Sequence, residues 1–179
     1  MAIEFKGRWF EKEFRKRKKP VGSSWRVDET YVKVKGQWKY LYRAVDKEGA
    51  TIDFLLTAKR DVKAAKRFFK KAIGSSAVPE KITIDKSGTN KAAAERFNIE
   101  RRRRKKKKIV IRQIKYLNNI VEQDHRAIKR RIRPMLGFKS FRSATKTIAG
   151  IELMHMIRKG QMADCRKLTP AEQFYSLAG

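Results

Sequence analysis

Three carboxylates stand at positions where acidic side chains can share divalent metal ions. Asp28 lies within the first strand-like stretch, Asp85 directly follows the apolar stretch 82–84, and Glu122 falls near the start of a helical stretch. Carboxylate oxygens are preferred ligands of Mg²⁺ and Mn²⁺, and such ions can activate a nucleophile and stabilise a leaving oxygen in phosphoryl transfer. Lys129 follows Glu122 by two helical turns, so its ammonium lies on the same helix face, where it could hold a phosphate.

Each of these acids also has a purely structural interpretation. Asn119 and Glu122 have the spacing of a capping box, which gives Glu122 a role without catalysis. Asp85 precedes Lys86-Ser87-Gly88 and could be a turn residue only. The hypothesis of a metal site therefore depends on all three acids occurring in this order on strand, strand and helix.

The elements that must position these residues follow from the periodicity of the apolar side chains. Alternating β-branched and aromatic residues predict an antiparallel meander of three strands, with turns at 35–36 and 47–49. Later segments predict helices and strands in alternation: a helix from 61 to about 73, a strand over 81–85, a short helix over 91–97, a strand over 109–114, and helices over about 119–133 and 140–159. This order predicts an α/β fold with a ribonuclease H-like mixed sheet flanked by helices, in which the first and fourth strands are neighbours.

The charge balance indicates a polyanionic partner. The 179 residues contain 47 Lys and Arg against 18 Asp and Glu, a formal net charge of +29, yet 41% are hydrophobic, which is enough for a folded domain. One cationic block, Arg15–Lys19, is expected to repel itself and stay solvated unless bound. A second block could bind phosphates without sequence preference or be a solvated loop; it consists of Arg101, Arg102, Arg103, Arg104, Lys105, Lys106, Lys107 and Lys108. A ribosomal or nucleoid protein would explain this charge but not the positions of the three acids.

Other residues exclude several classes of protein or leave alternatives open. The sequence has neither a run of about 18 apolar residues nor a secretory signal, so we expect no membrane span and a cytoplasmic location. The single cysteine, Cys165, can form no internal disulfide. His125 lies on the helix face of Glu122 and is either near the metal or in a structural hydrogen bond, whereas His155 is expected to pack within its helix. The aromatic residues of the meander are interpreted as core and strand-surface residues, with base stacking as an alternative.

Several stretches together resemble bacterial insertion-sequence transposases of the DDE type, with the closest match to insertion-sequence family six. The stretches are WRVDETYVKVKG at 25–36, YLYRAVD at 40–46, RQIKYLNN at 112–119 and LGFKS at 136–140, and FKGRWF at 5–10 is similar to the start of that family. The resemblance covers about 25–161 and implies a ribonuclease H-like DDE catalytic domain there, in which the run 101–108 departs from the family as a basic loop insertion. The sequence pattern adds a short basic N-terminal segment and linker over 1–24 and a C-terminal tail over 162–179.

The same resemblance implies the chemistry of the site. Asp28, Asp85 and Glu122 would be the metal-binding catalytic triad for two Mg²⁺ or Mn²⁺ ions, with Asp28 bridging them, and Lys129 would be the basic residue that contacts DNA. The implied reaction is metal-dependent cleavage and transfer of DNA strands at transposon ends and target DNA, carried out by a dimer or higher multimer in the bacterial cytoplasm, in association with the nucleoid.

One departure from the family leads to an alternative hypothesis. Family members carry a helix-turn-helix module before the catalytic domain, and residues 11–24 are too few to form one. The alternative is a catalytically impaired transposase remnant that binds DNA without sequence preference through its cations.

Overall fold

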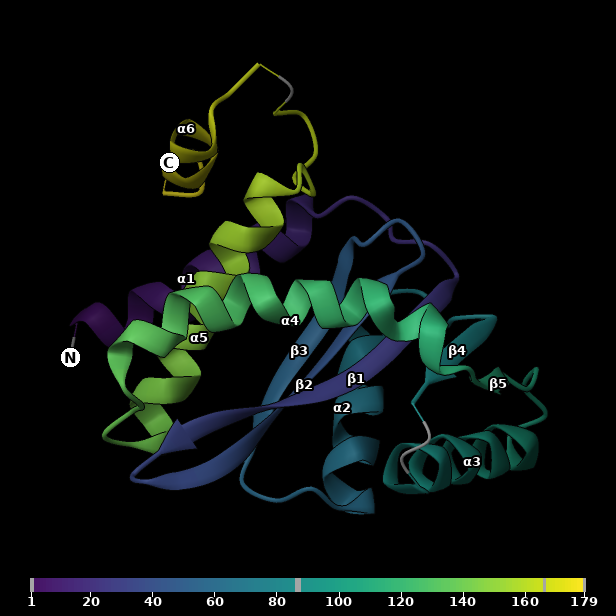
Figure 1. Ribbon diagram of the computed structural model, residues 1–179. Coiled ribbons are helices and arrows are strands. Elements are labelled where there is room, and N and C mark those ends of the chain that lie inside the picture. Colours follow the sequence, from purple (N-terminus) through teal and green to yellow (C-terminus); the bar gives the residue numbers. More distant parts are fainter. Residues whose placement is uncertain (1, 86–87, 166, 179) are drawn as a thin grey trace.

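The computed structural model describes residues 2–85, 88–165 and 167–178 and shows one mixed sheet with helices on both sides (Figure 1). In chain order the elements are α1 (Ala2–Arg17), β1 (Ser24–Val34), β2 (Gln37–Asp46), β3 (Thr51–Thr57), α2 (Val62–Ser75), β4 (Lys81–Ile84), α3 (Gly88–Arg103), β5 (Val110–Gln113), the 3₁₀ turn η1 (Lys115–Asn118), α4 (Asn119–Ile132), the 3₁₀ turn η2 (Arg133–Met135), α5 (Phe141–Arg158) and α6 (Pro170–Tyr175). None of the described helices is long and apolar enough to cross a membrane.

The sheet has the predicted topology. Its strand order is β3-β2-β1-β4-β5, with β1, β2 and β3 antiparallel and with β4 and β5 running parallel to β1. The first turn has two residues, Lys35 and Gly36, with φ of 50° and 74°. Positive φ at both positions is the type I′ geometry that suits the twist of a two-residue hairpin, and it fixes the β1–β2 register. The prediction that the first and fourth strands lie side by side is therefore confirmed.

Alternate residues of the strands supply two hydrophobic cores, one on each side of the sheet. Trp25 and Val27 of β1 pack with Phe68 and Phe69 of α2, and α3 completes this side. Val32 and Val34 of the same strand face the opposite core, to which α1, α4, α5 and the C-terminal residues contribute. In Figure 1, α4 crosses in front of the sheet and α2 lies behind it, so the two sides present different helices.

The N-terminal segment is a helix that packs onto this second core. Phe14 is fully buried, and Arg15 forms an ion pair of 2.9 Å with the buried carboxylate of Asp53. Lys18 donates a hydrogen bond of 2.6 Å from Nζ to the Ile52 carbonyl. The expectation that the whole Arg15–Lys19 block stays solvated is therefore wrong, because a buried acid and a carbonyl of β3 draw two of its cations inward.

The second cationic block begins inside α3, which is longer than predicted. Arg101, Arg102 and Arg103 form the last turn of this helix, where cations interact favourably with the helix dipole. Asn98 exchanges two hydrogen bonds with the backbone of Ile109, of 2.9 Å and 2.8 Å. These bonds close the loop that follows α3 at its base, and residues 102–108, the last two of α3 and the loop residues after them, are exposed.

Candidate active site

The register of two neighbouring parallel strands brings Asp28 and Asp85 to the same level of the sheet. The last paired residues of β1 and β4 are Val27 and Ile84, and Asp28 and Asp85 are the next residue of each chain segment. Adjacent parallel strands lie about 4.8 Å apart, and residues at equal register share a face. Two acidic residues from segments far apart in the sequence are thus neighbours at the end of β4.

Helix α4 lies against this point of the sheet. His125 Nε2 is 3.3 Å from Asp28 Oδ2, and the His125 and Asp28 side chains are 6% and 17% exposed. Glu122 stands one helical turn before His125, in the first turn of α4, and is exposed. Asn118 Nδ2 also approaches the Val27 carbonyl, at 3.5 Å, so the start of the helix lies over β1 beside Asp28.

The capping-box interpretation of Glu122 is wrong. The helix begins one residue earlier than that interpretation requires, with Asn118 as its N-cap, and the cap makes no side-chain hydrogen bond. Asn119 is already helical, so it cannot be the capping residue that a reciprocal pair with Glu122 requires. The turn interpretation of Asp85 involves Lys86 and Ser87, which lie outside the described residues.

A further acid, Glu29, lies on the other face of β1. Its side chain is 3% exposed, pairs with Arg60, and accepts a hydrogen bond of 2.7 Å from Asn90 Nδ2. Burial raises the pKa of Glu29, the Asn90 bond and Arg60 oppose that rise, and the charges of Asp28 and Asp85 add to it. This electrostatic coupling indicates that Glu29, Asp28 and Asp85 lie near one another at the centre of the sheet.

A buried ion-pair network holds α4 in place beside Asp28. Arg43, which is opposite Asp28 in the β1–β2 register, is fully buried and lies 2.6 Å from Asp124 Oδ2 and 2.8 Å from Glu152 Oε1. Asp124 Oδ1 also lies 2.6 Å from His155 Nε2 and 2.5 Å from Lys159 Nζ. Asp124 precedes His125 on α4, so the network fixes the turn of the helix that faces the two strand aspartates.

The network also sets the charge of Asp124. Burial by itself raises the pKa of this carboxyl, but the hydrogen bond with His155 and the charges of Arg43 and Lys159 outweigh burial and hold the pKa well below its usual range. Asp124 is therefore an anion at neutral pH. The sequence predicts a packing role for His155, and its hydrogen bond of 2.6 Å with Asp124 corrects that expectation.

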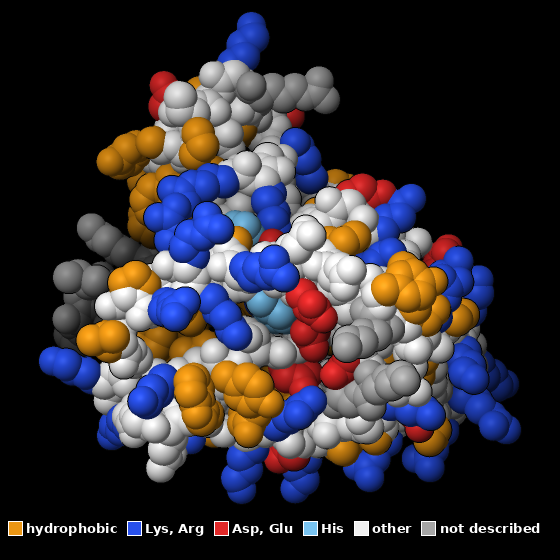
Figure 2. Space-filling view, viewed as in Figure 1, with side chains coloured by type: hydrophobic (Ala, Val, Ile, Leu, Met, Phe, Trp, Pro, Cys, Tyr) orange, Lys and Arg blue, Asp and Glu red, His pale blue; other side chains and the backbone are white. Residues whose placement is uncertain are grey.

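The space-filling view shows how these charges appear from outside. Acidic side chains gather beside a histidine near the middle of this face, and Lys and Arg side chains are distributed over the rest of it among hydrophobic and other side chains (Figure 2). Within residues 2–85, 88–165 and 167–178, no three His, Cys, Asp or Glu side chains are close enough to form a ready metal site. The described geometry thus provides two aligned carboxylates and a third on the facing helix, rather than a closed triad.

Comparison with known proteins decides the family. A family model described as a DDE domain matches residues 22–161 of this chain. The chain belongs to the DDE domain family of insertion-sequence transposases. Two relatives from Staphylococcus aureus are each 39% identical to this DDE domain chain over 146 residues: the transposase for insertion sequence-like element IS431mec (strain Mu50) and the transposase for insertion sequence element IS257 in transposon Tn4003.

The alignments with those relatives cover 82% of this chain and 62% of each relative. The chain thus spans somewhat less than two thirds of the length of the curated transposases that it matches.

Solved structures confirm the ribonuclease H-like fold of this DDE domain. The catalytic core domain of BIV integrase superposes with a TM-score of 0.55 at 14% identity, over 87% of this chain and 95% of the integrase chain. The HTLV-2 integrase catalytic core domain in complex with magnesium, in its dimeric form, gives a TM-score of 0.52 at 20% identity, over 67% of this chain and 75% of that chain. At these identities the likeness establishes the fold alone.

The cations predicted to bind DNA occupy two separate places on the DDE domain. Lys129 is exposed on α4, two turns beyond Glu122, and lines a groove between this helix and the part of β1 that follows Asp28. The block from Arg101 to Lys108 joins α3 to β5, at the edge of the sheet in Figure 1. The structure therefore brings Lys129, but not the block, to the side of α4 that carries Glu122.

Sequence reasoning missed the network that positions α4. Arg43 occurs inside the strand stretch Leu41-Tyr42-Arg43-Ala44-Val45, and a charged residue within a buried strand requires a buried partner. That signal was present in the sequence. Its partners, Asp124 and Glu152, are ordinary acids on amphipathic helices, and only the packing of α4 and α5 identifies them.

Proposed function

We propose that this DDE domain cleaves and joins DNA strands with two divalent metal ions held by Asp28, Asp85 and Glu122. The observation that carries the proposal is the β1–β4 register, whose last pair, Val27 and Ile84, directly precedes Asp28 and Asp85, with Glu122 in the first turn of the helix that lies against β1. The donor chemistry fits Mg²⁺ or Mn²⁺, because all three groups are carboxylates, the hard oxygen ligands that these ions prefer.

The surroundings of Asp28 also fit a bound divalent metal ion. Both ring nitrogens of His125 are buried without a hydrogen-bond partner in the part of the chain that the structure describes, and Nε2 faces Asp28 Oδ2. A buried polar atom without a partner is costly, so the approach of His125 to Asp28 is expected to tighten when the site is loaded. His125 then orients the Asp28 carboxylate, and the Arg43–Asp124 pair orients His125.

When bound, the ions would lower the pKa of an attacking water or 3′-hydroxyl and stabilise the leaving oxygen. In cleavage, a water oxygen forms a bond to phosphorus while the bond to the DNA 3′-oxygen breaks. In strand transfer, the released 3′-hydroxyl attacks a target phosphate and displaces its 3′-oxygen. Lys129 places one ammonium beside the acids, where it holds a non-bridging phosphate oxygen and fixes the strand for attack.

The first test compares wild type with Asp28→Asn. Calorimetric titration with Mn²⁺ should show two bound ions in wild type and loss of this binding in the variant, because the variant lacks one of the three carboxylates that would hold the ions. Nicking of a supercoiled plasmid in Mn²⁺ should fall by about 100-fold or more in the same variant.

Glu80→Gln is the matched control, because Glu80 is an exposed acid at the opposite end of β4 from Asp85. It should bind Mn²⁺ and nick DNA like wild type. Absence of Mn²⁺ binding in wild type, or equal nicking by wild type and Asp28→Asn, would overturn the proposal.

The second candidate function is DNA binding without catalysis. It is favoured by the exposed cationic block at 102–108 and by the net charge of +29. A remnant of this kind would bind duplex DNA with an affinity that falls steeply with salt, and would show neither Mn²⁺ binding nor nicking. Binding that is insensitive to salt would contradict this candidate.

A further inference from the structure

A groove next to the acids combines exposed aromatic rings with cations. Its volume is about 1180 Å³, and its walls are the β1–β2 hairpin on one side and α4 with η2 on the other. Tyr31 and Trp38 stand on the hairpin side and are 46% and 60% exposed. Their rings meet edge to face with centroids 6.2 Å apart.

The helix side of the groove is a stripe of cations that starts at the acids. Arg126, Lys129, Arg130 and Arg133 line the groove, and they follow Glu122 along α4 at spacings of four, seven, eight and eleven residues. These spacings lie along one side of a helix and extend about 16 Å from Glu122. In the described part of the chain, none of the four lies in an ion pair with a carboxylate, so their charges are open to a ligand.

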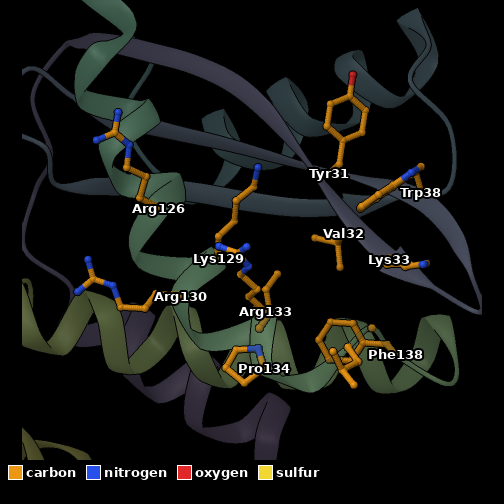
Figure 3. A pocket seen from close by; sticks show the side chains of 13 residues that line it. Tyr31, Val32, Lys33, Trp38, Arg126, Lys129, Arg130, Arg133, Pro134 and Phe138 are labelled. Carbon is orange, nitrogen blue, oxygen red and sulfur yellow. The ribbon is translucent and has the colours of Figure 1, made fainter.

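Backbone hydrogen bonds join the two walls of the groove at its far end. Phe138 exchanges two of them with the end of β1: its amide donates to Lys33 at 2.9 Å, and the Lys35 amide donates to its carbonyl at 2.8 Å. Gly137 has φ of 108°, and a Cβ there would lie 3.2 Å from the Lys33 carbonyl oxygen. A glycine is therefore needed for this approach. Figure 3 shows Lys129 reaching from α4 toward the side where Tyr31 and Trp38 stand.

We infer that this groove binds an unpaired stretch of the DNA strand whose phosphate reaches Asp28, with a base stacked on Trp38 beside the edge-to-face Tyr31 ring. Aromatic faces that point to solvent bind bases whose own faces are free, as in single strands and opened ends, whereas bases in a duplex are already stacked. The cation stripe complements the phosphates of the same strand and leads it from the groove to the acids. The inference deepens the proposed function and rests on it for the identity of the strand.

The test measures binding without metal, so that it does not depend on catalysis. The full chain, in EDTA at fixed salt, is titrated into a fluorescent 12-nucleotide oligothymidine and into a blunt duplex of equal length. Trp38→Ala should weaken binding of the single strand by roughly 5- to 150-fold, the range for loss of one stacked base, and should affect the duplex much less. Trp38→Phe should retain most of the affinity, since it keeps an aromatic face.

The control is Tyr175→Ala, which removes an aromatic ring that is 72% exposed on α6, outside the groove, and should leave both affinities unchanged.

The salt dependence of binding distinguishes the aromatic side of the groove from its cationic side. Trp38→Ala should keep the wild-type slope of log affinity against log salt, whereas Arg126→Gln should reduce the slope by about 0.7 for each phosphate that the variant no longer neutralises.

Equal single-strand affinity for wild type and Trp38→Ala would overturn the inference. A second result would also overturn it: wild type sediments as a dimer, Trp38→Ala sediments as a monomer, and the two bind DNA equally well. The groove would then bind a second copy of the chain. Loss of nicking with intact oligonucleotide binding concerns the proposed metal site only, so the two failures are distinguishable.

Discussion

At the residue scale, burial changes the charge behaviour of a lysine far from the acids. Lys18 is mostly buried between α1 and β3, and burial lowers its pKa from the ordinary 10.5 to about 8, although Asp53 nearby opposes that change. The folded protein therefore binds this proton less tightly than the unfolded chain does. The unfolded state holds more protons between these two values, so stability rises with pH across that window.

We predict that neutralising Lys18 removes a pH dependence of stability. In urea titrations, the free energy of unfolding contributed by Lys18 should increase by about 3 kcal/mol as pH rises from about 8 to 10.5. The free energy of unfolding of Lys18→Met should depend less on pH than that of wild type in this window. Lys16→Met, at an exposed position in the last turn of α1, is the control, and an equal loss of pH dependence there would contradict the prediction.

The candidate acids could be identified from the sequence because their element types were readable. Asp28 and Asp85 adjoin strands whose alternation is clear, and Glu122 opens an amphipathic helix. The roles of the three stay a prediction. The approach of His125 to Asp28 could not be derived, because both a metal-proximal and a structural position fitted its spacing from Glu122.

At the element scale, α4 depends on charges inside the core more than on its cap. Its N-cap makes no side-chain hydrogen bond, whereas Asp124 joins it to Arg43 of β2 and to His155 and Lys159 at the end of α5. Removal of one partner from a buried ion pair leaves the other charge uncompensated, which costs about 3–5 kcal/mol.

We predict that Asp124→Ala destabilises the protein by about 3–5 kcal/mol and also weakens Mn²⁺ binding, since His125 and Glu122 share the same helix. Chemical denaturation and calorimetry measure the two effects. Glu13→Gln removes one side of an exposed pair with Lys16 and should cost about 1 kcal/mol or less. A similar stability loss in both variants would show that the network does not anchor α4.

The sequence predicts the meander, but not helices α1 and α6. Alternation and the Lys35-Gly36 turn define the strands locally, whereas the apolar residues of α1 stand among many charges. Helix α6 did carry a signal: Thr169 and Glu172 form a reciprocal capping box, with Pro170 at the first turn.

At the scale of the whole molecule, the positive charge is divided between a stripe beside the acids and a block at the sheet edge. The net charge of +29 could be counted from the sequence, but its division depends on how α3 and α4 lie on the sheet. The block from 102 to 108 is exposed, so it can bind duplex phosphates at a distance from the site.

We predict that neutralising Lys105, Lys106, Lys107 and Lys108 to Gln flattens the salt dependence of duplex binding. The slope of log affinity against log salt should fall by about 0.9 for each phosphate that is no longer neutralised, and Mn²⁺ binding should not change. The control neutralises four scattered exposed lysines, Lys12, Lys47, Lys59 and Lys63, and so removes the same net charge. An equal change of slope in both variants would argue against a local role for the block.

The packing of the two chain ends has a consequence for synthesis. Phe10 of α1 lies against Phe174, with ring centroids 5.0 Å apart, and Phe14 shares a core with Leu177. Helix α1 therefore lacks part of its apolar packing until Phe174 and Leu177 have been made. At about 5–20 residues per second this delay lasts on the order of ten to thirty seconds, during which the apolar stripe of α1 is exposed to chaperones and to neighbouring nascent chains.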